Sequence, residues 1–170
     1  MKKAAIAGVI GLMGLIGLIG LMGLIRPIGP IPPSPSFSLR KVHESLYYLN
    51  DWKLPYPVYR FDTGDIDGDG KEDAMVGVIK STRFYPEKAQ RIFIFKLVDG
   101  KKVRPLWLGS KLGGVLQDFR YVNGYVRALE MTGDNLYSVS DWKWNDFGLH
   151  FERFLIKQSS KKSATQIFYQ

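Results

Sequence analysis

The chain has 170 residues, a length typical of a single domain, and its 45% hydrophobic and 24% charged residues are the composition of a globular protein. It contains no cysteine, which excludes disulfides, thiol chemistry and a lipid-modified N-terminal cysteine. The net charge of +8 would suit a nucleic-acid partner, but no basic run is interleaved with a nucleic-acid motif. We therefore expect no nucleic-acid partner.

The N-terminal segment indicates export. Lys2 and Lys3 precede an uncharged apolar stretch at residues 4–25. The apolar region of a cleaved signal peptide has roughly 7–15 residues, whereas a membrane span needs about 20. We interpret residues 1–26 as a signal anchor that is held in the membrane through residues 4–25. The alternative is a cleaved signal peptide, although the best candidate cleavage site, at residues 34–36, has proline in its middle.

Both interpretations place the rest of the chain in the cell envelope. The positive charges before the apolar stretch keep the N-terminus in the cytoplasm. The domain is then membrane-anchored, or secreted or periplasmic if the segment is cleaved.

Residues 27–38 are rich in proline, which prevents a helix and favours an extended linker. The next segment, residues 39–52, fits a short helix, because Ser38 is a suitable N-cap and apolar residues recur at helical spacing. The Tyr47-Tyr48 pair leaves a strand open as the alternative.

From residue 58 onward, short apolar segments alternate with turn residues, which is typical of an antiparallel sheet. Asp99-Gly100 and Asn123-Gly124 are strong signals for two-residue hairpins. The eight predicted strands are residues 58–61, 74–79, 91–98, 103–108, 116–122, 125–131, 136–144 and 149–156. The sequence thus predicts a mainly β domain at residues 39–157, an antiparallel meander of about eight strands that is blade-like or sandwich-like. Residues 158–170 are expected to form a frayed polar tail.

The most specific motif is an acidic loop at residues 65–73. Its four aspartates occupy loop positions 1, 3, 5 and 9, and two glycines let the backbone curl. Calcium is a hard cation that takes about 6–8 oxygen ligands, and carboxylates on alternate residues of a curled loop point to a common centre. The alternative is a plain acidic surface turn, since Asp-Gly pairs are common in turns. With Ca²⁺ as the expected cofactor, the predicted ligands are Asp65, Asp67, Asp69, the carbonyl oxygen of Lys71, and Asp73.

This loop resembles the FG-GAP/VCBS family of calcium-binding repeats. Residues 64–73 read Gly-Asp-Ile-Asp-Gly-Asp-Gly-Lys-Glu-Asp and lead directly into an apolar strand, as in that family. An EF-hand is excluded because it needs a glutamate at position 12, where this chain has Val76. The resemblance covers residues 58–80 and implies the same five calcium ligands, although Gly77-Val78-Ile79 stands where the family has Gly-Ala-Pro. Such repeats build β-propellers, but a single copy with about eight strands is too small for a closed ring of about 4–8 blades.

A wider run, residues 56–61 together with 105–110, resembles a group of short bacterial exported proteins. Some of them carry the transferred label nuclear receptor-binding factor 2. That label implies no activity, because an exported bacterial chain meets no nuclear receptor. The resemblance therefore supports an exported domain and nothing more specific.

These features favour a non-enzymatic domain with a structural or protein-interaction role, whose partner is an envelope protein or a glycan. A carbohydrate-binding module is the alternative, because Trp142 and Trp144 share one face of a strand and could stack on sugars. The competing interpretation places both tryptophans in the core.

An enzyme of unknown class is the third interpretation. His43 and His150 are the only histidines of the chain, and neither lies in a catalytic or metal-binding pattern. Glu130 and Glu152 could serve as an acid and a base, but exposed faces of strands explain both.

The anchor hypothesis predicts that the mature protein retains its N-terminal segment. N-terminal sequencing of the protein from membranes of the producing cells should then give Met1 or a residue close to it. A mature chain that begins near Phe37 would contradict a retained anchor and would establish a cleaved signal peptide.

Overall fold

The computed structural model describes residues 36–83, 85–109 and 111–170. The described residues all belong to one compact unit of the chain. The expected signal anchor and most of the proline-rich linker lie outside the described residues. In the part of the chain that is described, no helix has the length and apolar character required to cross a membrane.

The segment expected as a short helix at residues 39–52 instead contributes to a three-stranded antiparallel sheet. Its strands are adjacent in chain order: β1 (Leu39–His43), β2 (Leu46–Leu49) and β3 (Trp52–Leu54). The helical interpretation was therefore wrong, and the strand alternative is confirmed.

The buried residues of this segment recur at every second position, which is the period of a strand. Tyr47 and Leu49 are buried, whereas Val42, which the helix would have turned inward, is 49% exposed. Asn50 forms the turn between β2 and β3 with a φ of 52°. Its backbone N–H donates to the Ser38 carbonyl oxygen (2.8 Å), and its Oδ1 accepts from the Ser38 N–H (2.7 Å). Asparagine tolerates this left-handed conformation, so Asn50 favours a hairpin over a continuous helix.

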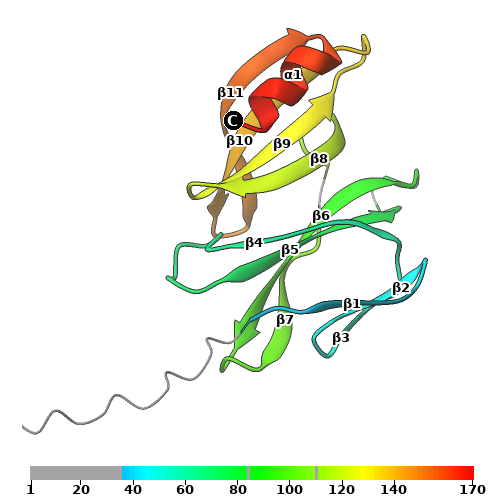
Figure 1. Cartoon of the computed structure of the whole chain (residues 1–170), viewed down its shortest axis with the longest axis vertical. Coiled ribbons are helices and arrows are strands. Elements are labelled where there is room, and N and C mark those ends of the chain that lie inside the picture. Colours follow the sequence, from blue (N-terminus) through cyan, green and yellow to red (C-terminus); the bar gives the residue numbers. More distant parts are fainter. Residues whose placement is uncertain (1–35, 84, 110) are drawn as a thin grey trace, which may run out of the picture. The chain divides into compact units, whose positions relative to one another are not determined.

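The eight strands predicted after residue 58 are confirmed, with ends shifted by at most three residues. They form two four-stranded antiparallel sheets, each with its strands in chain order (Figure 1). The first contains β4 (Val58–Gly64), β5 (Asp73–Lys80), β6 (Ala89–Val98) and β7 (Lys102–Trp107). The second contains β8 (Val115–Val122), β9 (Tyr125–Met131), β10 (Tyr137–Asn145) and β11 (Gly148–Ser159).

Two of the connecting turns have the backbone expected from their sequences. Asp99 and Gly100 adopt φ values of 53° and 64°, and Asn123 and Gly124 adopt 49° and 84°. Positive φ at both turn positions matches the right-handed twist of the flanking strands. The predicted hairpins are therefore confirmed.

The β4–β7 sheet is covered on both faces, which explains why β5 reads as a continuous apolar run. On one face, Val76, Val78 and Phe95 pack with Leu49 and Leu54 of the β1–β3 sheet. The opposite face packs against the β8–β11 sheet: Met75, Ile92 and Ile94 with Leu116, Phe119, Val126 and Ala128. The alternation along β6 thus sends successive side chains into two different cores.

The segment expected as a frayed tail at residues 158–170 is instead ordered. β11 continues to Ser159, and α1 (Lys161–Phe168) follows. Ser160 is its N-cap, with its Oγ accepting from the Ser163 N–H at 3.2 Å. Figure 1 shows α1 alongside β9 and β10.

The missed signal in this segment is a four-residue spacing. Ala164 and Phe168 are fully buried, and they pack against Leu129 and Val139 of the β8–β11 sheet. Residues four apart lie on one face of a helix, so two apolar residues were sufficient to anchor an otherwise polar segment.

If α1 is part of the folded domain, Phe168→Ala should lower the free energy of unfolding of the full chain by about 3–5 kcal/mol, the usual cost of removing a buried phenylalanine. Urea unfolding followed by tryptophan fluorescence measures the change. Gln166→Ala is the matched control, because Gln166 is exposed on the same helix. Equal stability of the two variants would contradict a docked helix.

Candidate metal centre

The acidic loop connects β4 to β5 in the sheet that is covered on both faces. Gly64, at the end of β4, pairs with Asp73, the first residue of β5, so the loop is closed at its base by the ladder. Gly68 and Gly70 adopt φ values of 77° and 80°. An added Cβ would meet nothing within 4 Å at either position. These glycines therefore serve the backbone conformation and not close packing.

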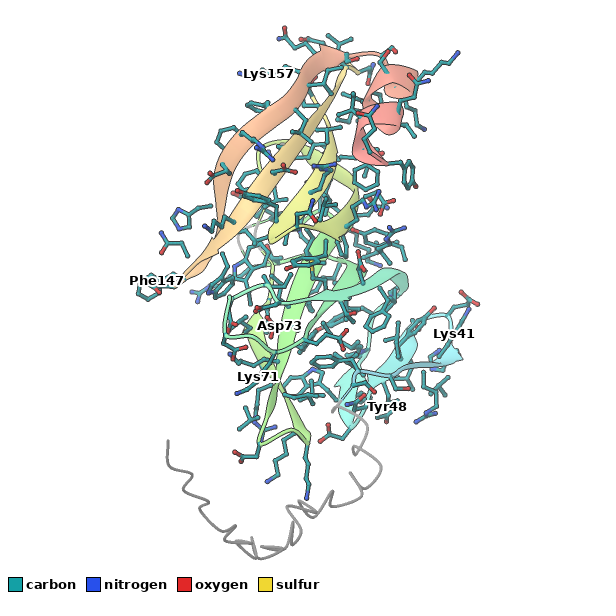
Figure 2. The ribbon with its side chains drawn as sticks, turned by 60° about the vertical axis from the view of Figure 1, so that its left-hand side comes forward. Lys41, Tyr48, Lys71, Asp73, Phe147 and Lys157 are labelled. Atoms are coloured by element: carbon teal, nitrogen blue, oxygen red, sulfur yellow. The ribbon has the colours of Figure 1, made fainter. Side chains whose placement is uncertain are left out.

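Three of the predicted ligands come together in this loop. One carboxylate oxygen from each of Asp65, Asp67 and Asp73 lies within 4.8 Å of the others. Figure 2 labels Lys71 and Asp73 at this connection. Asp69 does not join the three, and the Lys71 N–H donates to Asp69 Oδ1 at 3.0 Å. Metal binding by these residues, including Asp69 and the Lys71 carbonyl, stays a prediction.

Backbone N–H groups hold the carboxylates in place. Asp65 accepts from Gly68 through Oδ1 (2.8 Å) and from Gly70 through Oδ2 (3.1 Å). Asp67 Oδ1 accepts from the Asp69 N–H at 3.2 Å. Short local bonds of this kind fix the side chains before any ligand arrives, as aspartates in turns commonly do.

Asp73 is the most unusual acid of the loop, because only 1% of its surface is exposed. Its Oδ2 accepts from the N–H groups of Ile66 (3.0 Å) and Asp67 (3.3 Å). Among the described residues, no donor reaches its Oδ1. Burial, reinforced by the charge of Asp67, raises the pKa of Asp73 to about 6. A buried carboxylate that is only partly hydrogen-bonded is costly unless a cation or a proton compensates it.

A lysine from another strand faces the same loop, and sequence reasoning missed it. Lys96 Nζ forms ion pairs with Asp67 Oδ2 and with Asp69 Oδ2, the latter at 3.3 Å. The hydrogen bond to Asp67 raises the pKa of Lys96. The available signal was its place on β6: Lys96 follows Ile92 and Ile94 on the face of the strand that packs toward β8–β11, where a charge needs a partner.

Hydrogen bonds and packing contacts connect the β8–β11 sheet to the start of the loop. Tyr121 OH donates to the Asp65 carbonyl oxygen at 3.0 Å, and the Tyr121 N–H donates to Asp62 Oδ2 at 2.8 Å. A Cβ on Gly64 would lie 2.3 Å from the Tyr121 ring, so only glycine fits there. Ile66, 5% exposed, packs in the core between the two sheets. The loop is thus attached to both four-stranded sheets.

A hollow of about 730 Å³ lies beside the loop. Residues 69–73 form part of its wall, and Lys96, Leu97, Asp99 and Gly100 of the β6–β7 hairpin form another part. The conformation of the acidic loop therefore shapes this hollow directly.

The tryptophans considered for sugar binding are partly buried. Trp142 and Trp144 are half-buried and pack against the core between the two four-stranded sheets, which agrees with the core interpretation. Phe147 at the β10–β11 hairpin is 93% exposed, and Figure 2 labels it at the tip of that hairpin. Phe151 and Phe154 are 47% and 42% exposed.

The residues considered for catalysis are not brought together. His43 and His150 are both exposed, on β1 and β11. Glu130 is buried and accepts from the Gly114 N–H (2.7 Å) and from a serine hydroxyl, whereas Glu152 is exposed on β11.

Comparison of the chain with protein-family profiles, with curated proteins and with solved structures gives no significant match in any of the three.

The raised pKa of Asp73 predicts how the ion-free protein responds to pH. The folded state holds this proton more tightly than the unfolded chain, whose aspartates titrate near 3.9, so the contribution of Asp73 to stability falls as pH rises from about 4 through 6. In chelator, Asp73→Asn should be at least as stable as the unmodified chain at pH 7 and should lose this advantage at pH 4. Urea unfolding at both pH values measures it, and an equal stability difference at the two pH values would contradict the assignment.

Proposed function

We propose that this protein is a non-enzymatic domain of the cell envelope that binds Ca²⁺ in the loop at residues 65–73 and uses the ion to hold a binding surface in shape. The observation that carries the proposal is the convergence of Asp65 and Asp67 on Asp73, a buried carboxylate that accepts hydrogen bonds from the described residues only through Oδ2. Asp69 and the carbonyl oxygen of Lys71 complete the proposed ligand set.

The chemistry of the donors favours calcium over other divalent ions. The set consists entirely of oxygen atoms, which suits hard cations and disfavours zinc, whose structural sites use cysteine and histidine. Magnesium demands near-ideal octahedral geometry at about 2.0–2.1 Å, whereas calcium accepts irregular sets at about 2.3–2.6 Å. A curled loop of alternating aspartates and one carbonyl is irregular in this sense.

The charge balance of the loop supports a divalent ion. Asp65, Asp67 and Asp73 bring three negative charges within 4.8 Å of one another, and Lys96 supplies one positive charge. A carboxylate that is buried and incompletely paired costs free energy, and a bound cation removes that cost. Calcium would therefore stabilise the folded state by the same interactions that bind it.

The proposed role of the ion is structural. It would join the end of β4 to the start of β5, and through Ile66 and Tyr121 the loop is attached to the β8–β11 sheet. Each four-stranded meander has the strand order of a propeller blade, so we interpret the domain as two blade-like sheets, too few for a closed ring of about 4–8 blades. The hollow of about 730 Å³ beside the loop is the proposed place for an envelope partner.

The proposed location outside the cytoplasm suits a calcium site of low affinity. Residues 4–25 would anchor the protein in the membrane, or would be removed as part of a signal peptide. In both cases the loop would lie outside the cytoplasm. Extracellular calcium modules bind with a Kd of about 10⁻⁴–10⁻³ M, a range suited to compartments that are rich in calcium.

Carbohydrate binding is the weaker alternative. The exposed rings of Phe151 and Phe154 are inclined by 51° to each other, and Trp142 is at 82° to Phe151. Sugars stack on flat aromatic surfaces, and these rings form no flat platform.

If calcium binds as proposed, 10 mM Ca²⁺ should raise the Tm of the full chain by about 3–10 °C relative to chelator, because a ligand at about 10–100 times its Kd adds roughly 1.4–2.7 kcal/mol to stability. Differential scanning fluorimetry in mild detergent measures this shift. Asp67→Ala should abolish it.

Asp134→Ala is the matched control, since it removes an exposed aspartate in the turn between β9 and β10 and should keep the full calcium shift. The same 10 mM addition of Mg²⁺ should give a much smaller shift. An unmodified chain with no calcium-dependent change in Tm would contradict the proposal.

A further inference from the structure

The ammonium group of Lys96 occupies the mouth of the acidic loop. It comes from β6, 25 residues beyond Lys71 in the chain, and it forms ion pairs with Asp67 Oδ2 and Asp69 Oδ2. The side chain of Lys96 is 29% exposed, and that of Asp67 is only 12% exposed. The Asp67–Lys96 pair is therefore mostly shielded from water, where ion pairs are stronger than at an open surface.

The register of the sheet puts Lys96 beside the proposed ligands. Ala74 of β5 pairs with Phe95 of β6, so Lys96 lies one position further, next to Asp73. Asp67 uses Oδ1 to accept from the Asp69 N–H, which leaves Oδ2 as its outward oxygen. Lys96 pairs with that oxygen, so both carboxylate oxygens of Asp67, one of the proposed ligands, are already engaged.

We propose that Lys96 is a built-in counter-cation that keeps the empty loop folded and that calcium must displace to bind. The inference rests on the proposed calcium site and adds its regulation. An ammonium and a divalent ion cannot both lie against Asp67 Oδ2, because like charges at contact repel strongly. Lys96 would thus weaken calcium affinity and raise the concentration at which the site fills, while preventing collapse of the loop when calcium is scarce.

The first experiment measures calcium affinity by isothermal titration calorimetry on the full chain. Lys96→Met removes the charge and keeps an unbranched side chain that is one atom shorter. It should bind Ca²⁺ about tenfold more tightly, the scale of one shielded ion pair that no longer has to be broken. Lys96→Arg retains the charge and should bind like the unmodified chain.

Lys101→Met is the matched control for net charge. Lys101 is exposed in the neighbouring β6–β7 hairpin, and its side chain forms no ion pair with another described residue. This variant should leave the affinity unchanged. In chelator, Lys96→Met should melt below both Lys101→Met and the unmodified chain, because the loop has lost its only compensating charge from β6.

A second measurement uses the unmodified chain and does not depend on a variant that folds. Labelling of lysine amines with a low concentration of acetic anhydride, read by mass spectrometry, should show faster modification of Lys96 when Ca²⁺ is added, since the displaced amine becomes exposed. The rate at Lys101 should stay constant.

The outcomes separate the two proposals. Calcium binding with equal or lower affinity in Lys96→Met, or with unchanged labelling of Lys96, would overturn the displacement and leave the calcium site standing. Absence of binding in both the unmodified chain and Lys96→Met would overturn both. Binding by Lys96→Met alone would support the counter-cation and contradict calcium binding by the unmodified protein.

Discussion

Burial of strand β5 on both faces is the constraint on which the rest of the structure depends. One face packs against the β1–β3 sheet and the other against the β8–β11 sheet. Asp73, the first residue of β5, is therefore buried inside the protein. A carboxylate in that position needs compensation that water cannot supply. The two backbone N–H groups of the loop supply part of it, and they do so only if the loop curls back over its own end. The shape of the loop and the charge of its centre thus follow from the packing of one strand.

The remaining negative charge of the loop would attract both a lysine and a divalent cation. Lys96 brings a positive charge to Asp67 and Asp69, but a single ammonium does not balance three converging carboxylates. A calcium ion would balance them more fully and would also tie the β4–β5 connection to the wall of the adjacent hollow. In the proposed function, the ion therefore orders a surface of the domain, and the partner binds to that surface.

The sequence predicted the strands well because their signals are local. Apolar alternation, the continuous apolar run of β5 and turn residues such as Asp99-Gly100 and Asn123-Gly124 indicate the eight strands after residue 58. The helix expected at residues 39–52 failed because its apolar residues fit two periods, and Asn50 decided in favour of a hairpin. The C-terminal helix was missed because two buried residues, Ala164 and Phe168, are too weak a pattern without their partners on β9 and β10. At the loop, spacing alone indicated the aspartates. The positions of Lys96, Tyr121 and the buried Asp73 depend on pairing between distant strands, which no local pattern reveals.

The most direct test of the central claim is a crystal structure of the protein grown with calcium, with anomalous diffraction used to identify the ion. We expect an anomalous peak about 2.3–2.6 Å from oxygens of Asp65, Asp67 and Asp73, with the ammonium of Lys96 withdrawn from Asp67. A loop without such a peak at millimolar calcium, with Lys96 still paired to Asp67, would contradict it.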